Sequence, residues 1–392
     1  MSPKLVRGGA EISREGARRY LVGQLGLARP ARARGARGVR ALLERLRCIQ
    51  LDPLDVIGSN ADLVALARVD GIARGDVYRH LLPGHAFEHF AKERCLLPAS
   101  AFPYYRDKAA ETSWWRLSTR LERIAPSVID RVRDEVARRG PVTPDELADH
   151  GDVAPIDWSG WKGSARATVM ALEVLWTRCE IVVCGRTSRG KRYDIPRRAL
   201  ARVHDRPAGD FARWALGERV EAAGLLARAG GACWSMLADV RTTDTPDALV
   251  REGVLEQVRI EGASRPYLAP AGFRERRVER PDDRMRILGP LDPLLWDRKL
   301  VREVFGFEYV WEVYKPAAER RWGWYVCPLL HRGQLVGRLD ARVDGKTLVV
   351  DRIWREDGHA LDEAALAVAL ERHAEACGAS AVKRPRRLLA PR

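Results

Sequence analysis

The stretch SVIDRVRDEVARRGPVTPDEL, residues 127–147, decides the fold more clearly than any other part of the sequence. Its first half has helical spacing, and Ser127 is predicted to cap that helix. The Gly-Pro pair at 140–141 ends the helix, because proline cannot continue it. Thr143, with Glu146 three residues later, predicts a capping box at the start of a second helix.

The residues that follow complete a pattern of three helices and a hairpin. Residues 164–179 predict the third and longest helix, and the apolar run IVVC (181–184) predicts a strand. A Gly-containing turn leads to the second strand, RYDI (192–195). This order is typical of a winged helix, and its wing region, 186–202, holds seven basic residues and one acid.

A weaker version of the same order recurs further along the chain. Residues 210–229, 235–239 and 245–252 predict three helices, and 255–260 with 265–268 predict two paired strands. The order of elements repeats, but the sequence itself does not.

The C-terminal part has a different character. Residues 310–314, 324–330, 334–343 and 347–355 predict antiparallel strands joined by Gly-containing turns, and 361–377 predicts a closing helix. Near the other end, Ser13 is predicted to cap a helix in a mostly helical start. The predicted fold class is therefore α+β, with tandem winged-helix units followed by a C-terminal β-rich domain.

The predicted domains follow from these patterns. They are an N-terminal winged-helix region at 1–125, a winged-helix unit at 126–205, a second unit at 206–280, a C-terminal β-rich domain at 281–378 and a basic tail at 379–392.

The positive charge is concentrated at the two ends of the chain. The 392 residues carry a formal charge of +15. Residues 1–50 hold twelve basic and three acidic side chains, and 378–392 hold five basic and none acidic. A GC-rich genome would explain the 59 Arg against 9 Lys equally well, but it explains the clustering less well. Basic ends favour a polyanionic partner such as nucleic acid, although a solvated tail is the plain alternative.

Several classes of protein are excluded by composition. No apolar run is long enough to span a membrane, and the first twenty residues lack the apolar core of a secretory signal. The seven cysteines are scattered without a CxxC pair, which favours a reducing cytoplasm. We therefore expect a cytoplasmic, nucleoid-associated protein, acting as a monomer, without a cofactor or metal.

Two blocks of motifs resemble a known family. The first block holds Gln50-Leu51-Asp52-Pro53-Leu54, Asn60 through Val69, Phe87-Glu88-His89 and Leu96-Leu97-Pro98. The second holds Leu291 through Arg298, Phe305-Gly306-Phe307, Tyr314 through Ala318, Gly323-Trp324-Tyr325 and Leu335 through Arg338. Together, and in this order, they resemble the winged-helix DNA glycosylases of the YcaQ/AlkZ type over essentially residues 10–375.

The resemblance implies an activity and a catalytic pair. Enzymes of this family remove alkylated purines and unhook interstrand crosslinks, using a Gln-x-Gln or Gln-x-Asp motif that stands here as Gln50-Leu51-Asp52. In an extended segment Gln50 and Asp52 would face the same side. Asp52 would stabilise the cationic sugar and accept a proton from water, and Gln50 would orient that water. Because no amine nucleophile is indicated, we expect a monofunctional enzyme.

Two alternatives stay open from the residues alone. Asp52 and Pro53 would also suit a plain turn with a solvated Gln50, which is the better reading without the resemblance. In function, the alternative is a winged-helix transcriptional regulator that binds DNA without catalysis.

Candidate DNA contacts follow from the same pattern, although each is also a candidate solvated side chain. The predicted partner is double-stranded DNA with alkylated or crosslinked purines. Tyr20, Lys162, Arg166, Lys191 and Arg192 lie where winged helices meet phosphates, and Lys315, Arg320 and Arg321 lie at a predicted hairpin tip.

One metal motif is weighed and set aside. His85, Glu88 and His89 match the HxxEH pattern of a zinc peptidase, which requires a helix and a third ligand. No third ligand is identifiable, so we predict no metal site.

Overall fold

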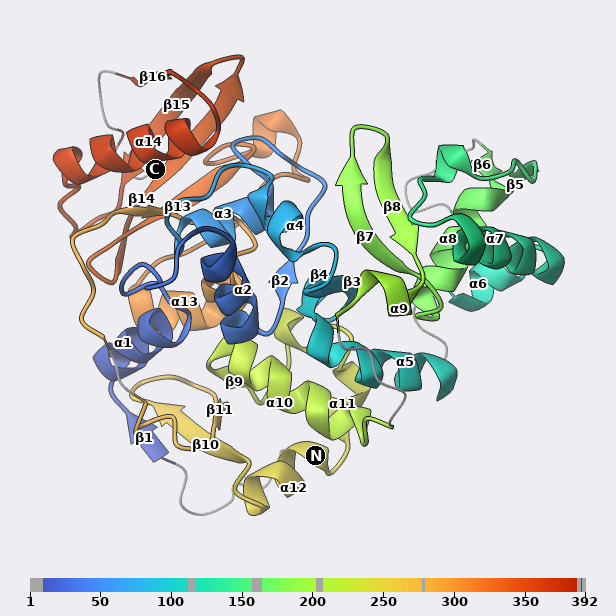
Figure 1. Ribbon diagram of the computed structural model, residues 1–392. Helices are drawn as coiled ribbons and strands as arrows, with labels where there is room; N and C mark the ends of the chain where they lie inside the picture. The colour runs from blue at the N-terminus through green and yellow to red at the C-terminus, as the bar shows by residue number, and fades with distance from the viewer. Residues whose placement is uncertain are drawn as a thin grey trace. The chain divides into compact units, whose positions relative to one another are not determined.

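A computed structural model describes residues 10–111, 117–156, 164–201, 207–276, 279–385 and 389. Helices and strands are mixed along the chain, and the predicted α+β class is confirmed (Figure 1). The chain forms two compact units that are each discontinuous in sequence. The larger holds Met1–Val77, Phe90–Cys95 and Ala212–Arg392, and the smaller holds Tyr78–His89 and Leu96–Phe211.

The larger unit contains most of the strands. Its elements are β1 (Ala10–Ile12), α1 (Arg14–Gln24), α2 (Gly35–Leu46), β2 (Ile49–Gln50), α3 (Asn60–Leu66), β9 (Leu226–Ala227), η3 (Ala232–Trp234), α11 (Ala238–Thr242), α12 (Thr245–Arg251), β10 (Leu255–Ile260), β11 (Tyr267–Pro270), β12 (Arg286–Ile287), η4 (Pro293–Leu295), α13 (Arg298–Phe305), η5 (Ala317–Glu319), β13 (Val326–His331), β14 (Gln334–Asp344), β15 (Thr347–Arg355), α14 (Glu363–Ala376) and β16 (Ala381–Lys383).

The smaller unit is mostly helical. Its elements are η1 (Ala99–Ala101), α5 (Phe102–Glu111), α6 (Leu117–Leu121), α7 (Pro126–Arg139), η2 (Pro144–Glu146), β5 (Asp152–Val153), β6 (Ala165–Arg166), α8 (Ala167–Thr177), β7 (Val182–Thr187), β8 (Gly190–Asp194) and α9 (Pro196–Ala199). The chain passes from one unit to the other within α4 (Asp76–Leu81), β3 (Ala86–Phe90), β4 (Arg94–Pro98) and α10 (Phe211–Ala223).

The order of elements predicted for 127–195 is present in the smaller unit. Helix α7 begins two residues earlier than predicted, with Ala125 rather than Ser127 as its N-cap, because Pro126 suits the first helical position. The capping box is confirmed, since the Glu146 carboxylate accepts the Thr143 backbone N–H at 2.6 Å and its hydroxyl at 3.0 Å. The box starts only the short 3-10 turn η2, where we expected an α-helix.

Strands β7 and β8, which follow α8 in the sequence, form the predicted hairpin. They are antiparallel, and the paired residues run from Val182 opposite Asp194 to Thr187 opposite Gly190. Gly140, which ends α7, lies so near this hairpin that a Cβ there would stand 2.6 Å from the Asp194 carboxylate. Only glycine allows that approach, so the helix end and the hairpin fix each other.

The second predicted helix-and-hairpin order is also present. Helices α10, α11 and α12 precede strands β10 and β11, which join a sheet of order β1-β10-β11-β9. Strand β1 leads into α1, whose N-cap is Ser13 as predicted, with the side chain accepting from Gly16 N at 3.0 Å. The subdivision into tandem winged-helix units stays a prediction.

The C-terminal sheet has the order β12-β13-β14-β15-β16, and α14 packs on it (Figure 1). Leu366 and Leu370 from α14 share one buried cluster with Leu348 and Ile353 from β15. The basic tail begins within this sheet, because β16 pairs parallel with β15. The strand predicted at 310–314 is wrong: the chain there is irregular and a 3-10 turn follows it.

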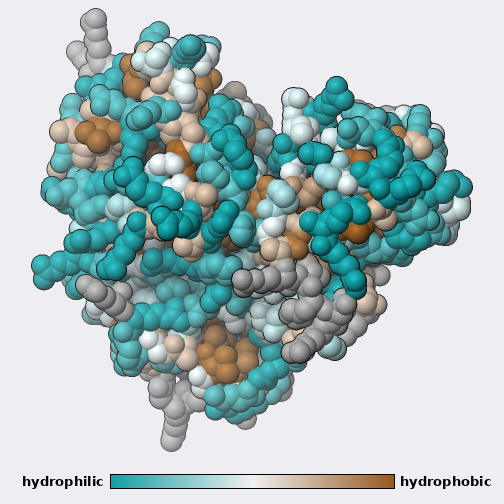
Figure 2. Space-filling model, in the orientation of Figure 1, coloured by the Kyte–Doolittle hydropathy of each residue, from teal (hydrophilic) through white to brown (hydrophobic). Residues whose placement is uncertain are grey.

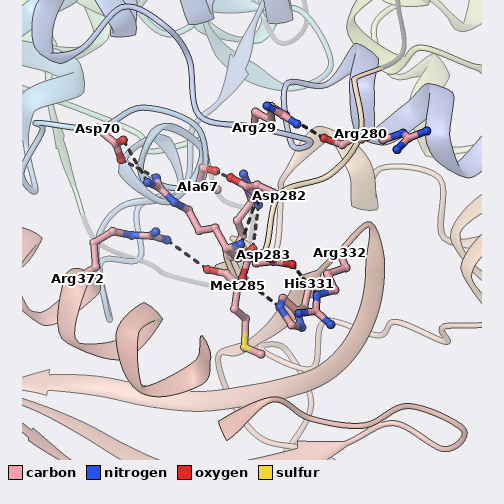
Figure 3. A network of polar contacts seen from close by, with 12 residues as sticks. Arg29, Ala67, Asp70, Arg280, Asp282, Asp283, Met285, His331, Arg332 and Arg372 are labelled. Atoms are coloured by element: carbon pink, nitrogen blue, oxygen red, sulfur yellow. Dashed lines mark hydrogen bonds and ion pairs between the residues drawn. The ribbon is translucent and has the colours of Figure 1, made fainter. Parts of the chain in front are cut away.

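The segment that leads into this sheet is held by polar contacts (Figure 3). The Arg286 guanidinium donates to the Asp282 carboxylate at 2.7 Å and to Ala67 O at 3.1 Å. Arg284 pairs with Asp70 at 2.6 Å, and Arg372 donates to the backbone of the same segment. The predicted boundary at 280/281 therefore precedes a firmly bonded stretch of chain.

Hydrophilic residues predominate on the face drawn in Figure 2, with hydrophobic residues in small separate areas. Within the described residues, no helix combines the length and apolarity needed to cross a bilayer. The exposed large hydrophobic side chains include Tyr314, at 86% exposure, and Trp324, at 40%. Both belong to the loop between α13 and β13.

Candidate functional site

Gln50 lies at the end of β2, directly after the turn that ends α2. Arg47 adopts a left-handed conformation at the helix end, and Ile49 and Gln50 follow as a short buried strand. The carbonyl oxygen of the Gln50 side chain accepts a hydrogen bond from the Lys92 ammonium at 3.0 Å. Gln50 is 6% exposed, so the predicted alternative of a solvated amide is wrong.

Asp52 lies two residues on, in a turn that the sequence only partly predicted. Strand β2 stops at Gln50, so the strict alternation expected to bring both side chains to one side does not continue to Asp52. One Asp52 carboxylate oxygen accepts from Leu54 N at 2.8 Å, and the other has no partner among the described residues. Burial raises the pKa of Asp52, and the Leu54 hydrogen bond opposes that rise.

The Asp52 carboxylate has no positively charged partner near it: no ion pair involves Asp52 in the described part of the chain. The buried phenol of Tyr325 has a raised pKa, first through burial and then through the nearby Cys327 and Asp52. Asp52 is therefore a half-buried carboxylate with one oxygen fixed and one available.

Asn60 ties this segment to the second block of motifs. Its side chain is fully buried, and its nitrogen donates to the Gln50 backbone oxygen at 2.8 Å. Its oxygen accepts from Leu291 N at 3.2 Å. A Cβ on Gly289 would approach that oxygen to 2.6 Å, so the glycine is required there. Residues far apart in sequence thus meet at the Gln50 backbone.

A buried ion pair fixes the same two blocks to each other. Arg68, 1% exposed, donates to both oxygens of the fully buried Asp292, at 2.7 and 2.9 Å. Its remaining groups donate to Leu25 O and Val64 O. A bidentate pair in which every guanidinium nitrogen is bonded is rigid, which makes it a support for the turn that carries Leu291.

Lys92 is a site residue that sequence analysis missed. It is 7% exposed, and burial lowers the pKa of its ammonium. The ammonium also lies 5.5 Å from the ring centre of Trp296. Lys92 and Trp296 line a cavity of about 400 Å³, with a glycine pair at 230–231 and Leu291 on other parts of its wall. The sequence signal was absent, since Ala91-Lys92-Glu93-Arg94 reads as a solvated charged turn.

The first of the predicted DNA contacts, Tyr20, is buried. Tyr20 is 5% exposed, packs edge-on against Phe273 and donates its hydroxyl to Gly224 O at 3.3 Å. This burial argues against the predicted phosphate contact, because the phenol already belongs to the core. Lys162 lies outside the described residues.

The other candidates of the smaller unit have internal partners. Exposed Arg166 pairs with Asp145 at 2.8 Å. Lys191 lies 3.8 Å from Glu173, and Arg192 donates to Pro141 O at 2.9 Å. A phosphate at any of these positions would compete with a partner that is already present.

Lys315, Arg320 and Arg321 do not lie at a hairpin tip, and that prediction is wrong. They lie in an irregular loop built around Glu312, which is 2% exposed. Its carboxylate accepts from Trp322 N at 2.7 Å, from Lys315 at 2.9 Å and from Arg321 N at 3.1 Å. These bonds outweigh burial and lower the pKa of Glu312. The Glu312 carboxylate thus ties both ends of the loop together through the backbone of Arg321 and Trp322.

The HxxEH sequence does not form a helical metal motif. Residues 86–90 are strand β3, so the helical spacing of His85 and His89 is absent. Glu88 is fully buried and pairs with Arg186. A search of the described part of the chain finds no group of three metal-binding side chains.

Comparisons with known proteins identify the family of the chain and a solved structure of similar fold. The model of a family described as "DNA glycosylase AlkZ-like" matches residues 43–376, which includes both motif blocks. Among solved structures, the chain is similar to the Streptomyces sahachiroi DNA glycosylase AlkZ, with a TM-score of 0.61 and 19% identity. The match covers 97% of this chain and 100% of that chain.

Proposed function

The chain belongs to the AlkZ-like DNA glycosylase family, and on that premise we propose that it excises N7-alkylated purines and unhooks interstrand crosslinks through Asp52 and Gln50. Its activity as a DNA glycosylase follows from the family, which covers most of the chain. A regulator without catalysis is not favoured, because the matched family is one of enzymes. The lesion class and the catalytic roles are the proposal.

A single observation carries it. Asp52 is a half-buried carboxylate with one oxygen held by Leu54 N and the other without a partner among the described residues, two residues from the buried amide of Gln50. An unneutralised carboxylate held this way suits a reaction that develops positive charge on a sugar. Burial disfavours the charged form of Asp52 and raises its pKa, so keeping the carboxylate there costs folding free energy.

The chemistry fits an alkylated purine as leaving group. An N7-alkylguanine is already cationic, so the glycosidic bond breaks without a general acid for the base. The Asp52 carboxylate stabilises the cationic sugar and accepts a proton from the attacking water. No covalent intermediate is needed, and we propose that the enzyme is monofunctional and leaves an intact abasic strand.

An open site would suit crosslinked substrates. A base tied to the opposite strand cannot be rotated freely out of the stack, unlike the bases most glycosylases flip. Asp52 is partly exposed and lies in a surface turn beside exposed Pro53. This position would let a carboxylate reach a lesion that stays near the duplex.

The test is incubation with duplex DNA carrying N7-methylguanine or a nitrogen-mustard crosslink. We expect abasic sites, seen as strand breaks only after alkaline treatment, with wild-type protein and none with Asp52→Asn. Borohydride should trap no covalent protein–DNA adduct. No product above buffer with either lesion would refute the proposed substrate class, and strand breaks without alkali would refute the monofunctional assignment.

A further inference from the structure

We propose that Lys92 is a positioning residue that holds the Gln50 amide with its carbonyl oxygen turned inward and its NH₂ group turned to the reacting water. The inference rests on the proposed role of Gln50 and adds a residue and a direction to it. It assigns Gln50 the role of donor, where the sequence alone left donor and acceptor open.

The first step is the orientation of the amide. The Lys92 ammonium has three donors and no acceptor, so the Gln50 atom that faces it at 3.0 Å has to be the oxygen. The oxygen is thereby engaged inside the protein. The amide nitrogen has no partner among the described residues, so its two N–H donors are available to a ligand.

The second step is the rigidity of the arrangement. The Gln50 backbone is held by Asn60, whose side-chain nitrogen donates to the Gln50 backbone oxygen at 2.8 Å. The Lys92 backbone lies in the turn between β3 and β4, and Leu51 N donates to the backbone oxygen of Arg94, the first residue of β4, at 2.8 Å. Both ends of the Gln50–Lys92 hydrogen bond therefore come from segments that are bonded to each other.

The third step is the burial of Lys92. A lysine that is 7% exposed costs free energy because burial disfavours its charge. Within the described residues its ammonium has one hydrogen-bond acceptor, Gln50, and the face of Trp296 at 5.5 Å. No carboxylate pairs with it there, so an ion pair does not explain why a lysine is buried at this position. Its hydrogen bond to the Gln50 amide does.

Asp52 and Gln50 then have different roles toward the attacking water. Water donates its proton to the Asp52 carboxylate and needs a donor at its own oxygen to fix its direction. An inward-facing Gln50 oxygen leaves the NH₂ group to provide that donor. Without Lys92 the amide can turn over and present its oxygen, which competes with Asp52 for the same water proton.

The experiment measures single-turnover excision rates and DNA affinity for wild-type protein and a set of variants on N7-methylguanine DNA. Lys92→Met, which keeps the length but removes the donor, should slow excision about tenfold to a hundredfold with Kd unchanged. Lys92→Arg should restore much of the rate, since it keeps a donor. Lys299→Met, on the wall of the same cavity but paired with Ser264, should behave as wild type.

A double variant separates positioning from other roles. Gln50→Ala with Lys92→Met should be no slower than Gln50→Ala alone, because Lys92 acts only through Gln50. Multiplied losses would overturn the inference, and so would a Lys92→Met rate equal to wild type. A borohydride adduct lost in Lys92→Met would overturn it in favour of an amine nucleophile.

A reference variant keeps the two proposals distinguishable. If Asp52→Asn is inactive and Lys92→Met is fully active, only the role of Lys92 fails. If Asp52→Asn keeps the wild-type rate, the proposed catalytic pair fails whatever Lys92 does. Thermal unfolding of Lys92→Met, measured alongside, should show a folded protein. If it does not, Lys92→Arg becomes the deciding arm: a rate near wild type supports the inference, and a rate as low as that of Gln50→Ala overturns it.

Discussion

The wing hairpin β7–β8 and the segment Ile49–Asp52 both looked like DNA-facing regions in the sequence, but their polar groups are satisfied differently. In the hairpin, Lys191 lies 3.8 Å from Glu173 and Arg186 pairs with Glu88. In the other segment, Gln50 and Asp52 each have one atom bonded and one without a partner among the described residues. Two basic residues of the hairpin therefore have carboxylate partners, whereas the Asp52 carboxylate of the segment has no cationic partner among the described residues.

The difference separates two uses of polar groups. A side chain whose bonds are complete contributes to structure, and a phosphate that binds it has to displace the partner already present. A side chain that is half fixed has a set direction and an available atom, which is the condition for chemistry. Substitutions of the two kinds of group should therefore differ in the size of their effect. They should also differ in whether they change the excision rate, the stability or the affinity for DNA.

The largest expected effect is at Asp52. Asp52→Asn keeps the shape and the acceptor for Leu54 N but removes the charge, so single-turnover excision should fall by about 10²–10⁴-fold. DNA affinity should be unchanged. The free energy of unfolding at neutral pH should not fall, because the replaced carboxylate has a raised pKa and is disfavoured by folding. A loss of affinity equal to the loss of rate would identify Asp52 as a binding group instead.

Next in size is the buried pair behind the site. Asp292→Ala leaves the Arg68 guanidinium buried and unpaired, and should lower the free energy of unfolding by roughly 3–5 kcal/mol. Urea denaturation measures this, with exposed Asp283→Ala as the control that should change it by less than about 0.5 kcal/mol. Equal stability of the two variants would show that the pair does not support the site.

The pH profile should show the half-buried character of Asp52. Its ionised form is the active one and burial raises its pKa, so the excision rate should fall on acidification at a higher pH than for an ordinary Asp. The fall approaches tenfold per pH unit below that pKa. The profile is measured under single-turnover conditions, with circular dichroism to show that the protein stays folded. An acid limb at the ordinary value of 3.8 would contradict the assignment.

Local signals explain what the sequence could predict. Ser13 caps α1, Gly140 ends α7 and the Thr143–Glu146 capping box is present, because each depends on residues only a few positions apart. The strand predicted at 347–355 is found with the same ends for the same reason. The motif at 50–52 was found through a resemblance, and its residues alone favoured a turn with a solvated amide.

Long-range contacts explain what the sequence missed. Where a strand was predicted at 310–314, the buried Glu312 carboxylate accepts Trp322 N, ten residues away, and the chain forms a loop. Lys92 was not singled out in the sequence, and its contacts with Gln50 and Trp296 join distant parts of the chain. Tyr20 likewise became a core residue through Gly224. None of these partners is visible from spacing along the chain.

The smallest expected effect compares two basic residues of the same hairpin, Arg189 and Lys191. Arg189, exposed in the turn after Thr187, makes no ion pair in the described part of the chain, whereas Lys191 faces Glu173. If the wing follows the DNA backbone, Arg189→Gln should flatten the salt dependence of binding by about 0.9 in log Kd against log salt, the effect of one lost phosphate contact. Lys191→Gln should flatten it less, because part of its charge is already compensated by Glu173. Fluorescence anisotropy with undamaged duplex over a salt series measures both slopes. Equal changes would mean that DNA displaces Glu173 fully, and unchanged slopes for both would remove the wing from the DNA interface.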